Sequence, residues 1–532
     1  MTAQPGDSNR EWADCITMPP LSQKSHFLKD FTALIAGCAF PLAFAPFQIV
    51  PVAFGSLAVL FWVWRNAGPG RASLRGFLFG LGQFAVGVYW IHVCLHDYAG
   101  STDLAAFIIT ASAVIFLAGF PALAGLLAAM LVPNHAAKKL LLVYPGCWIS
   151  SEWLRAWLEF PGFPWLQVGY SQADEIPGAL APVLGVYGVG FSVAFSAGAL
   201  LYSLNPSCSA RKPVLVCLGL LWTFMALIQH YPWTSPAGRI LKVALLQGNI
   251  VQQLKWQPEA KRQALRWYID NTRNHWDADL IVWPETAVPI SHHKIEGLLD
   301  DLSGEAVHHG SDLLIGLPVY DPEKQRSYNG IVTLGSGPGR YLKRHLVPFG
   351  EYLPFQPVSG FVTQHMDFKM VGFSPGKKRQ PPIKAAGIPL APSICYEDVF
   401  GQEMLAAMPE ALYLVNITND AWFGHSIALD QNLQMARMRS LETGRYLVRA
   451  ANTGLTAIVS PFGDIAKLAR PFDATVLTGE INPMEGITPY MLVGDYMMLG
   501  FIVGSLLVVY IAGNHPQVSG AGHPVNPGQT VP

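Results

Sequence analysis

The chain has 532 residues, a net charge of −1 and only 13% charged residues, whereas soluble globular proteins carry about 25%. The deficit falls on residues 27–232, which hold few charges, while residues 240–485 have the composition of a soluble domain. This asymmetry predicts a membrane protein with one large extramembrane domain. Near-zero net charge, with no basic stripe and no zinc-ligand spacing, argues against a protein that binds nucleic acid or zinc.

The N-terminal segment, residues 1–29, is polar and merges into an apolar run without a small-residue cleavage site. A secretory signal peptide would carry such a site. We therefore expect the first apolar stretch to stay in the protein as a membrane anchor.

Eight apolar stretches approach the roughly 20 residues that cross a bilayer. The fifth is the least regular, because Pro145, Glu152 and Arg155 interrupt it. Glu152 and Arg155 either pair on one helix face and brace the domain, or serve a function inside the membrane. The expected spans are 30–47, 49–65, 74–94, 104–132, 139–157, 179–204, 213–230 and 490–513.

Basic residues in the connecting loops predict the orientation of these spans. The loops after the first and third spans contain no Lys or Arg, and those after the second, fourth and sixth do. Because Lys and Arg favour the cytoplasmic side, we expect 1–29 and the tail 514–532 in the cytoplasm and the domain outside. The basic residues are Arg65, Arg71, Arg75, Lys138, Lys139, Arg211 and Lys212.

Short apolar, β-branched runs alternate with amphipathic helical patterns across 240–485. The helical patterns cover 259–276 and 428–447, and PFGD at 461–464 predicts a turn between the last strands. Such alternation is typical of an α/β domain with a buried sheet. The expected strands are 243–250, 278–285, 311–319, 329–335, 389–395, 411–418, 446–452 and 455–465.

Cys395 is the only one of seven cysteines that lies in the expected domain. Outside the cytoplasm, paired cysteines form disulfides, but Cys395 has no partner within its domain. A lone thiol of this kind is either a buried passenger or a reactive group. The other six, in or near the membrane portion, are Cys15, Cys38, Cys94, Cys147, Cys208 and Cys217.

Glu285, Lys343 and Cys395 each stand at the end of an expected strand, where functional side chains are often found. A cysteine needs a base or a nearby cation to become a nucleophile. A carboxylate can take the thiol proton, and an ammonium can stabilise an oxyanion. Taken singly, Glu285 also fits a surface acid and Lys343 a solvated charge, which Glu351 would only neutralise.

Three motifs carry a family resemblance. WPE at 283–285, YLKRHLVPFGEYLP at 341–354 and ICYED at 394–398 resemble the nitrilase (carbon–nitrogen hydrolase) superfamily and its Glu–Lys–Cys triad. Three further strings resemble the apolipoprotein N-acyltransferase family, a membrane-embedded branch of that superfamily, and this resemblance covers nearly the whole chain. The strings are QGNIVQQLKW at 247–256, NITNDAWFG at 416–424 and QMARMRSLETGRYLVRAANTG at 434–454.

The resemblance implies an architecture and a location. The fold would be an eight-helix transmembrane bundle, with seven helices in 30–232 and one in 490–513. The domain at 240–485 would be a nitrilase-like αββα sandwich. The protein would lie in the bacterial inner membrane with this catalytic domain facing the periplasm.

The resemblance also implies roles for single residues. Glu285 would be the general base, Lys343 the oxyanion stabiliser and Cys395 the acylated nucleophile. Glu351 would orient the lysine. Two further side chains, Tyr396 and Glu397, would shape the pocket of the nucleophile.

Aromatic side chains are the expected contacts of the substrate. Trp256 either lines the substrate entrance or is a packing aromatic. The stretch 355–378 spreads its aromatics without a strand or helix period. It would either form a loop that dips into the outer leaflet and admits acyl chains, or cap the domain core. The residues concerned are Phe355, Phe361, Phe368 and Phe373.

The implied reaction moves the sn-1 acyl chain of a phospholipid, expected to be phosphatidylethanolamine, through a Cys395 thioester. The acceptor would be the α-amino group of a diacylglyceryl apolipoprotein, and neither a cofactor nor a metal would be needed. One alternative is a membrane-anchored amidase with the same triad. Another is a transporter or receptor whose domain only binds a ligand, although the spans show no inverted repeat.

Overall fold

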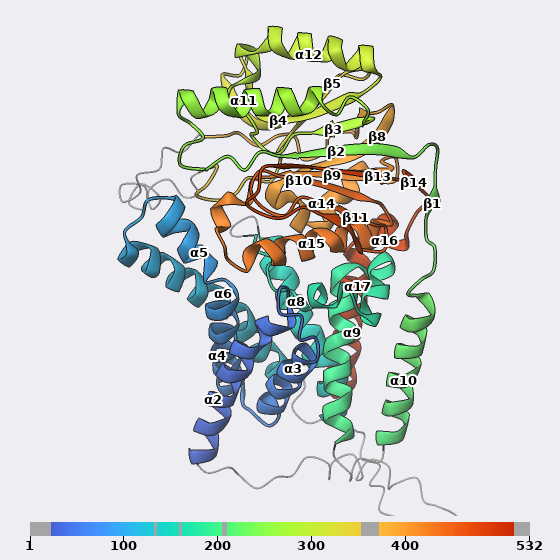
Figure 1. Cartoon of the computed structure of the whole chain (residues 1–532). Helices are drawn as coiled ribbons and strands as arrows, with labels where there is room; N and C mark the ends of the chain where they lie inside the picture. The colour runs from blue at the N-terminus through green and yellow to red at the C-terminus, as the bar shows by residue number, and fades with distance from the viewer. Residues whose placement is uncertain (1–22, 132–135, 159–161, 205–209, 353–371, 515–532) are drawn as a thin grey trace, which may run out of the picture.

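The computed structural model describes residues 23–131, 136–158, 162–204, 210–352 and 372–514. A region of helices lies below an α/β domain, and both connections between the two parts run along one side (Figure 1). Several expected features lie outside the described residues. They are the tail after 514, most of 1–29, Phe355, Phe361, Phe368, Cys15 and Cys208.

The helical region is built from apolar helices separated by short connections. Three of them are long and apolar enough to cross a membrane: α6, the stretch Ile176–Ser203 that contains α9, and α10. Pro69–Gly87 and Trp90–Tyr98 pass the same test as a pair that bends by 47°. The helices are α2 (Gln23–Ala39), α3 (Pro51–Trp64), α4 (Pro69–Gly87), α5 (Trp90–Val93), α6 (Asp103–Leu131), α7 (Ala136–Lys138), α8 (Tyr144–Trp157), α9 (Ala181–Ser203), α10 (Arg211–Ile228), α16 (Pro489–Val493) and α17 (Tyr496–Asn514).

Among its described residues, the region therefore holds three candidate spans, or four if the bent pair is one span. Helices at the other four expected spans are shorter or less regular. Of these, α3 and Tyr496–Ile511 are apolar but short.

The charged residues of the fifth expected span hold a neighbouring loop. Arg155 donates hydrogen bonds to the carbonyl groups of Phe163 and Trp165, and a Glu152 carboxylate oxygen accepts one from the N–H of Val168 at 2.9 Å. Both side chains are buried. In this structure they brace the loop at 163–168, within the helical region.

The domain contains two six-stranded sheets packed face to face. One has the order β12-β11-β10-β9-β8-β7, and the other β13-β2-β3-β4-β5-β6. The strands of the first sheet are β7 (Ile383–Ala385), β8 (Ile388–Ile394), β9 (Tyr413–Thr418), β10 (Leu447–Ala451), β11 (Ala457–Val459) and β12 (Ile465–Leu468). Those of the second are β2 (Leu241–Gln247), β3 (Leu280–Val282), β4 (Asp312–Asp321), β5 (Arg326–Leu334), β6 (Gly339–Leu342) and β13 (Thr475–Ile481).

The strand directions bring the chemistry-bearing strand ends to defined edges. In the first sheet β8, β9 and β10 are parallel, and in the second β2, β3 and β4 are parallel. Parallel strands are buried on both faces, which explains their continuous apolar runs. A third, two-stranded sheet pairs β1 (Ser235–Pro236) with β14 (Met484–Glu485), so the chain enters and leaves the domain at one place.

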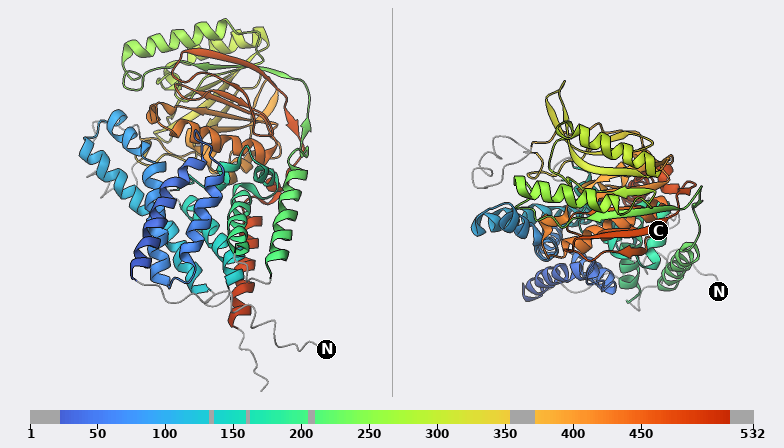
Figure 2. Two further views of the ribbon diagram at one scale, coloured as in Figure 1. Left: turned by 60° about the horizontal axis from the view of Figure 1, so that its bottom comes forward. Right: turned by 45° about the horizontal axis from the view of Figure 1, so that its top comes forward.

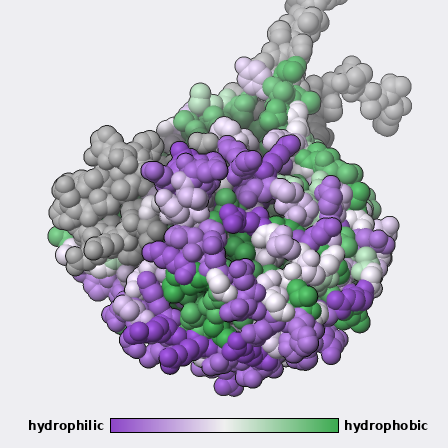
Figure 3. Space-filling model, turned by 90° about the horizontal axis from the view of Figure 1, so that it is seen from above, coloured by the Kyte–Doolittle hydropathy of each residue, from purple (hydrophilic) through white to green (hydrophobic). Residues whose placement is uncertain are grey.

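Helices cover both outer faces of the paired sheets (Figures 1 and 2). On one side lie α11 (Pro258–Arg273) and α12 (Glu296–His309), whose outer surface is largely hydrophilic (Figure 3). On the other side lie α14 (Gly401–Met404) and α15 (Ala428–Thr443). Met435 and Met438 of α15 belong to the same hydrophobic core as α9, so this layer is buried against the helical region. The domain is a four-layered α/β sandwich seated on helices.

Most predicted elements of the domain are confirmed. The helical patterns at 259–276 and 428–447 are α11 and α15, and the PFGD turn joins β11 to β12. The run 455–465 is not one strand, because this turn divides it. The elements that the sequence did not predict include α12, β7 and β13.

Arg449 on β10 holds the first sheet together beneath its carboxyl edge. The guanidinium lies 2.6 Å from an Asp398 oxygen and 3.1 Å from an Asp420 oxygen, and it donates to the side-chain oxygens of Asn416 and Asn432. The arginine and both aspartates are at most 1% exposed. One cation therefore joins the ends of β8, β9 and β10 to α15.

Replacing Arg449 by Met should destabilise the chain strongly, because Asp398 and Asp420 would remain buried without a counter-charge. Breaking a buried pair in this way costs ~3–5 kcal/mol. The control Arg273→Met removes an exposed ion pair with Glu305, which should change stability little. Thermal unfolding of the purified chains in detergent tests this, and equal melting temperatures for the two variants would contradict it.

Candidate functional site

Glu285 lies just after β3 and is only 7% exposed. Its Oε1 accepts a hydrogen bond from the Asn329 side chain at 2.7 Å and lies 3.3 Å from the Lys343 ammonium. Its Oε2 accepts the backbone N–H of Asn419 at 2.9 Å. Both carboxylate oxygens are thus fixed in direction.

The course of the WPE segment depends on Gly316 of β4. A Cβ atom at this position would lie 2.3 Å from the carbonyl oxygen of Pro284 and 2.9 Å from the Cα of Glu285. The N–H of Ala287 also donates to the Gly316 carbonyl at 3.0 Å. Glycine has no side chain that could clash here, so the backbone of Pro284 and Glu285 can pass close to β4 at Gly316.

Lys343 lies just after β6, and its side chain is 1% exposed. The ammonium is 2.9 Å from Glu351 Oε2 and 3.3 Å from Glu285 Oε1. Burial by itself would lower the pKa of Lys343, but the carboxylates of Glu285 and Glu351 outweigh it and raise the pKa well above its ordinary value. Lys343 is therefore a permanent cation at this site.

Asn329 of β5 fixes the two carboxylates relative to each other. Its amide donates to Glu285 Oε1 at 2.7 Å and to Glu351 Oε1 at 2.9 Å. Its backbone carbonyl accepts the N–H of Lys343 at 2.8 Å. This residue was not predicted from the sequence, where its only signal was a polar amide within an expected strand.

Three residues that are not glycine adopt left-handed backbone angles around these groups. Cys395, which directly follows β8, has φ +54°, Thr286 beside Glu285 has φ +47°, and Phe349 near Glu351 has φ +61°. Each such conformation costs of order 1–3 kcal/mol and persists where the surroundings enforce it. Strain of this kind often gathers at functional sites.

The Cys395 thiol lies at the boundary of two hydrophobic cores, because it packs against both the helical core and the core between the sheets. It is a free thiol. Burial raises the pKa of Cys395, the Glu285 carboxylate raises it further, and the Lys343 ammonium and a hydrogen bond with Thr418 lower it. The raised pKa means that the resting group is a protonated thiol.

Tyr396 and Glu397, which follow the thiol in the sequence, bind two different parts of the chain. The Tyr396 hydroxyl donates to the carbonyl of Gly162 at 2.9 Å, which ties the segment to the helical region. Glu397 is fully buried, and its oxygens accept the N–H groups of Arg344 at 2.7 Å and Ile394 at 2.7 Å. Glu397 thus connects the segment after Lys343 with the segment before Cys395.

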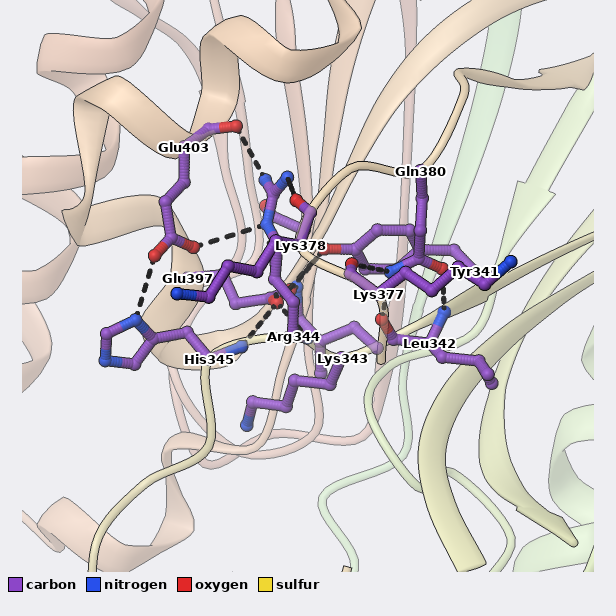
Figure 4. Close-up of polar contacts among 12 residues, drawn as sticks. Tyr341, Leu342, Lys343, Arg344, His345, Lys377, Lys378, Gln380, Glu397 and Glu403 are labelled. Carbon is purple, nitrogen blue, oxygen red and sulfur yellow. Dashed lines mark hydrogen bonds and ion pairs between the residues drawn. The ribbon is translucent and has the colours of Figure 1, made fainter. Parts of the chain in front are cut away.

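Figure 4 shows the network next to Glu397. Arg344 lies between Glu397 and Glu403, its Nε 3.2 Å from a Glu403 oxygen, and His345 Nδ1 is 2.9 Å from the other Glu403 oxygen. The Lys343 side chain extends away from these carboxylates. Consecutive residues therefore serve two different ion-pair networks.

The aromatic residues expected to contact substrate are only partly described. Trp256 is 40% exposed, with the Lys261 ammonium 5.5 Å from its ring centre. Phe373 is half-buried, and its N–H donates to the Glu351 carbonyl at 3.0 Å. The structure brings Phe373 near the acid that holds Lys343.

Lys255 is a second buried lysine that the sequence analysis missed. Its ammonium is 3.4 Å from the backbone carbonyl of Glu285, and the residue is 1% exposed. Burial lowers the pKa of Lys255 to about 8, although the Glu285 carboxylate opposes the shift. The string LKW alone gives no sign of this burial.

Glu285, Lys343 and Glu351 are thus in direct contact, and the Cys395 thiol is within electrostatic reach of Glu285 and Lys343. A thiol beside a carboxylate and a fixed ammonium can attack a carbonyl carbon, pass its proton to the carboxylate and leave the developing oxyanion near the ammonium. The arrangement suits acyl transfer.

Comparison with known proteins agrees with this chemistry. Residues 36–199 match the apolipoprotein N-acyltransferase N-terminal domain, and residues 242–488 match the carbon-nitrogen hydrolase family. An apolipoprotein N-acyltransferase of Methylococcus capsulatus is 47% identical over 93% of this chain and 99% of its own length. Another, from Coxiella burnetii, is 40% identical over 91% of this chain and 100% of its own. The chain therefore belongs to the apolipoprotein N-acyltransferase family.

Proposed function

We propose that the chain is an N-acyltransferase that moves the sn-1 acyl chain of a phospholipid to the α-amino group of a diacylglyceryl apolipoprotein. One observation carries the proposal. Glu285, Lys343 and Cys395 come from three strand ends and converge where the domain meets apolar helices. Family membership supports the same substrates.

In the first half-reaction Glu285 accepts the thiol proton as Cys395 Sγ attacks the ester carbonyl carbon. The raised pKa of Cys395 makes this base necessary. Lys343 stabilises the oxyanion, since Glu351 and Asn329 hold its ammonium and its partners in place. The intermediate collapses, the glycerol oxygen leaves with the proton from Glu285, and a lysophospholipid departs from the thioester.

In the second half-reaction the neutral α-amino group of the acceptor attacks the thioester carbon. Glu285 takes the proton that the nitrogen loses, and Lys343 again stabilises the oxyanion. The thiolate of Cys395 leaves and regains its proton from Glu285, so the product is an amide and the enzyme is restored. Dividing one difficult transfer into two steps is the advantage of covalent catalysis.

The proposed setting is the bacterial inner membrane, with phosphatidylethanolamine as donor and the domain facing the periplasm. All eight helical stretches would span the bilayer, with 1–29 and 514–532 in the cytoplasm. Supporting this arrangement, the α15 layer and Cys395 are packed against the helical core, which would hold the thiol close to the lipid phase.

Incubation with a phosphatidylethanolamine that carries different sn-1 and sn-2 chains should add the mass of the sn-1 chain to the peptide containing Cys395. The Cys395→Ala variant should gain nothing, and Glu285→Gln should acylate at least roughly 100-fold more slowly because its base is lost. Peptide mass spectrometry measures both, and an adduct on another residue would contradict the proposal.

Adding a diacylglyceryl lipopeptide with a free α-amino group should discharge the adduct and give an N-acyl lipopeptide. The N-acetylated lipopeptide is the matched control and should not react. If the adduct were discharged equally fast in buffer alone, or if short-chain amides were hydrolysed instead, the chain would be a hydrolase.

The rate at which iodoacetamide alkylates Cys395 should keep rising with pH beyond the ordinary thiol pKa of about 8.5. The reason is that burial raises the pKa of Cys395. At fixed pH, Glu285→Gln should react faster and Lys343→Met more slowly, since the carboxylate raises and the ammonium lowers that pKa. The exposed acid Glu323 gives the control Glu323→Gln. Equal rates in the Glu285 and Lys343 variants would exclude these charge effects.

The proposed orientation predicts which residues a membrane-impermeant maleimide reaches. In the Glu323→Cys variant, the new thiol lies at an exposed position between β4 and β5 and should be labelled in cells whose outer membrane alone is permeabilised. In the Gly68→Cys variant, the new thiol lies at an exposed position between α3 and α4 and should be labelled only after the inner membrane is opened. The reverse pattern would place the domain in the cytoplasm.

A further inference from the structure

A cavity of about 820 Å³ lies between the helical region and the domain. The helical wall includes Trp153 and Trp157 of α8 and Tyr187 of α9. The domain wall includes Arg344 and Phe400. The cavity is therefore built by both parts of the chain.

This cavity is separate from the proposed reaction centre but shares its supporting segments. Glu285, Lys343 and Cys395 are not among its lining residues. Its walls include Arg344 and His345, directly after Lys343, and Phe400, five residues after Cys395. The rings of His345 and Phe400 are stacked with centres 3.9 Å apart, which joins the two segments.

Arg439 of α15 offers this cavity a buried donor. One of its nitrogens lies 3.0 Å from Glu442 Oε1 and forms an ion pair with it. Its Nε and Nη1 have no hydrogen-bond partner among the described residues, although the side chain is 1% exposed. Buried donors without a partner are costly, so this group is suited to an acceptor that enters the cavity.

Gly401 packs closely against that donor. Both Gly401 and Arg439 line the cavity, and a Cβ atom on Gly401 would lie 2.3 Å from Arg439 Nη1. A side chain at position 401 would therefore displace the guanidinium from its present place.

The remaining charges favour an anion over a cation. Arg344, Lys378 and Arg439 line the cavity with two carboxylates, Glu403 and Asp495. Glu403 already pairs with Arg344 and His345 (Figure 4), and Asp495 accepts the hydroxyl of Tyr490 at 2.7 Å. The lining thus holds three cations against two carboxylates, and two Arg439 nitrogens have no hydrogen-bond partner among the described residues.

Aromatic side chains mark the level of the cavity relative to a bilayer. Trp157, at the end of α8, is 65% exposed, and Tyr496, at the start of α17, is 67% exposed, and both line the cavity. Trp and Tyr gather at the headgroup level of membranes. An anion reaching the cavity at this level would be the phosphate of a lipid.

We propose that this cavity binds the phosphate of a glycerophospholipid through Arg439 and Lys378, with its acyl chains beside α8 and α17. The lipid bound here is additional to the one that reacts at Cys395, so the site does not depend on the acyl transfer. It uses residues of both parts of the chain, and its occupancy would hold the domain on the helices.

The test uses the full-length Cys395→Ala chain in detergent with a photoreactive phosphatidylethanolamine that carries a diazirine in its headgroup. Peptide mapping should find crosslinks at 153–158 and 399–403. The half-buried Ala156 lines the cavity, and Ala156→Trp should fill it and reduce these crosslinks at least tenfold. Ala113→Trp, at a half-buried position of α6, is the matched control and should change nothing.

A charge variant tests the phosphate contact with little risk to folding. Lys377 and Lys378 are both exposed, but only Lys378 lines the cavity. Lys378→Gln should weaken crosslinking at these segments roughly threefold to tenfold, and Lys377→Gln should not. A photoreactive diacylglycerol without phosphate should crosslink poorly.

Three results would overturn the proposal. One is unchanged crosslinking at 153–158 and 399–403 in both Ala156→Trp and Lys378→Gln. Another is equal crosslinking by the phosphate-free diacylglycerol. The last is that inorganic phosphate removes these crosslinks at concentrations at which unlabelled phosphatidylethanolamine does not. Free phosphate would then be the ligand, and the proposal would be wrong.

Discussion

The buried ammonium of Lys343 requires two carboxylates beside it, and much of the domain is arranged to supply them. Removing a charge from water costs several kcal/mol unless partners compensate for it. Glu285 and Glu351 provide that compensation at 3.3 and 2.9 Å, and the Asn329 amide holds both acids. The partners come from separate segments, so the site forms only when β3, β5 and β6 are in register.

Because every buried charge needs a partner, the charges of the candidate site can be told apart from those that only stabilise the fold. Arg344 follows Lys343 directly, yet it binds Glu403, while Glu397 binds the backbone around both segments. Beneath the first sheet, Arg449 neutralises Asp398 and Asp420. Each buried acid of these networks thus has its own cation or set of N–H donors. Among the carboxylates, Glu285 raises the pKa of Cys395 most, and Asp420 raises it less.

The sequence predicted the repeating strands and the two amphipathic helices well, because their apolar residues follow the period of the element. It missed α12, whose buried residues, Leu299, Leu302 and Ala306, are sparse among acids and histidines. It missed β13 because residues 475–481 are mostly half-exposed, and only their antiparallel pairing with β2 makes them a strand.

Within the site, the motifs identified Glu285, Lys343, Glu351 and Cys395, but not the residues that orient them. Asn329 was predicted only as part of a strand, and Lys255 only as part of a string. Their contacts join positions tens of residues apart in the sequence. Long-range pairing of this kind leaves no periodic signal, so it emerges only from the packed structure.

The pairing of β2 with β13 and of β1 with β14 also bears on how the protein is made. During synthesis β2 lies at the edge of its sheet, because its partner β13 is made more than 200 residues later, just ahead of α17. Until then an open edge is available for wrong partners. Because β13 and α17 follow one another closely in the sequence, they are synthesised at nearly the same moment. Closure of the sheet and insertion of the last helix are therefore coupled in time.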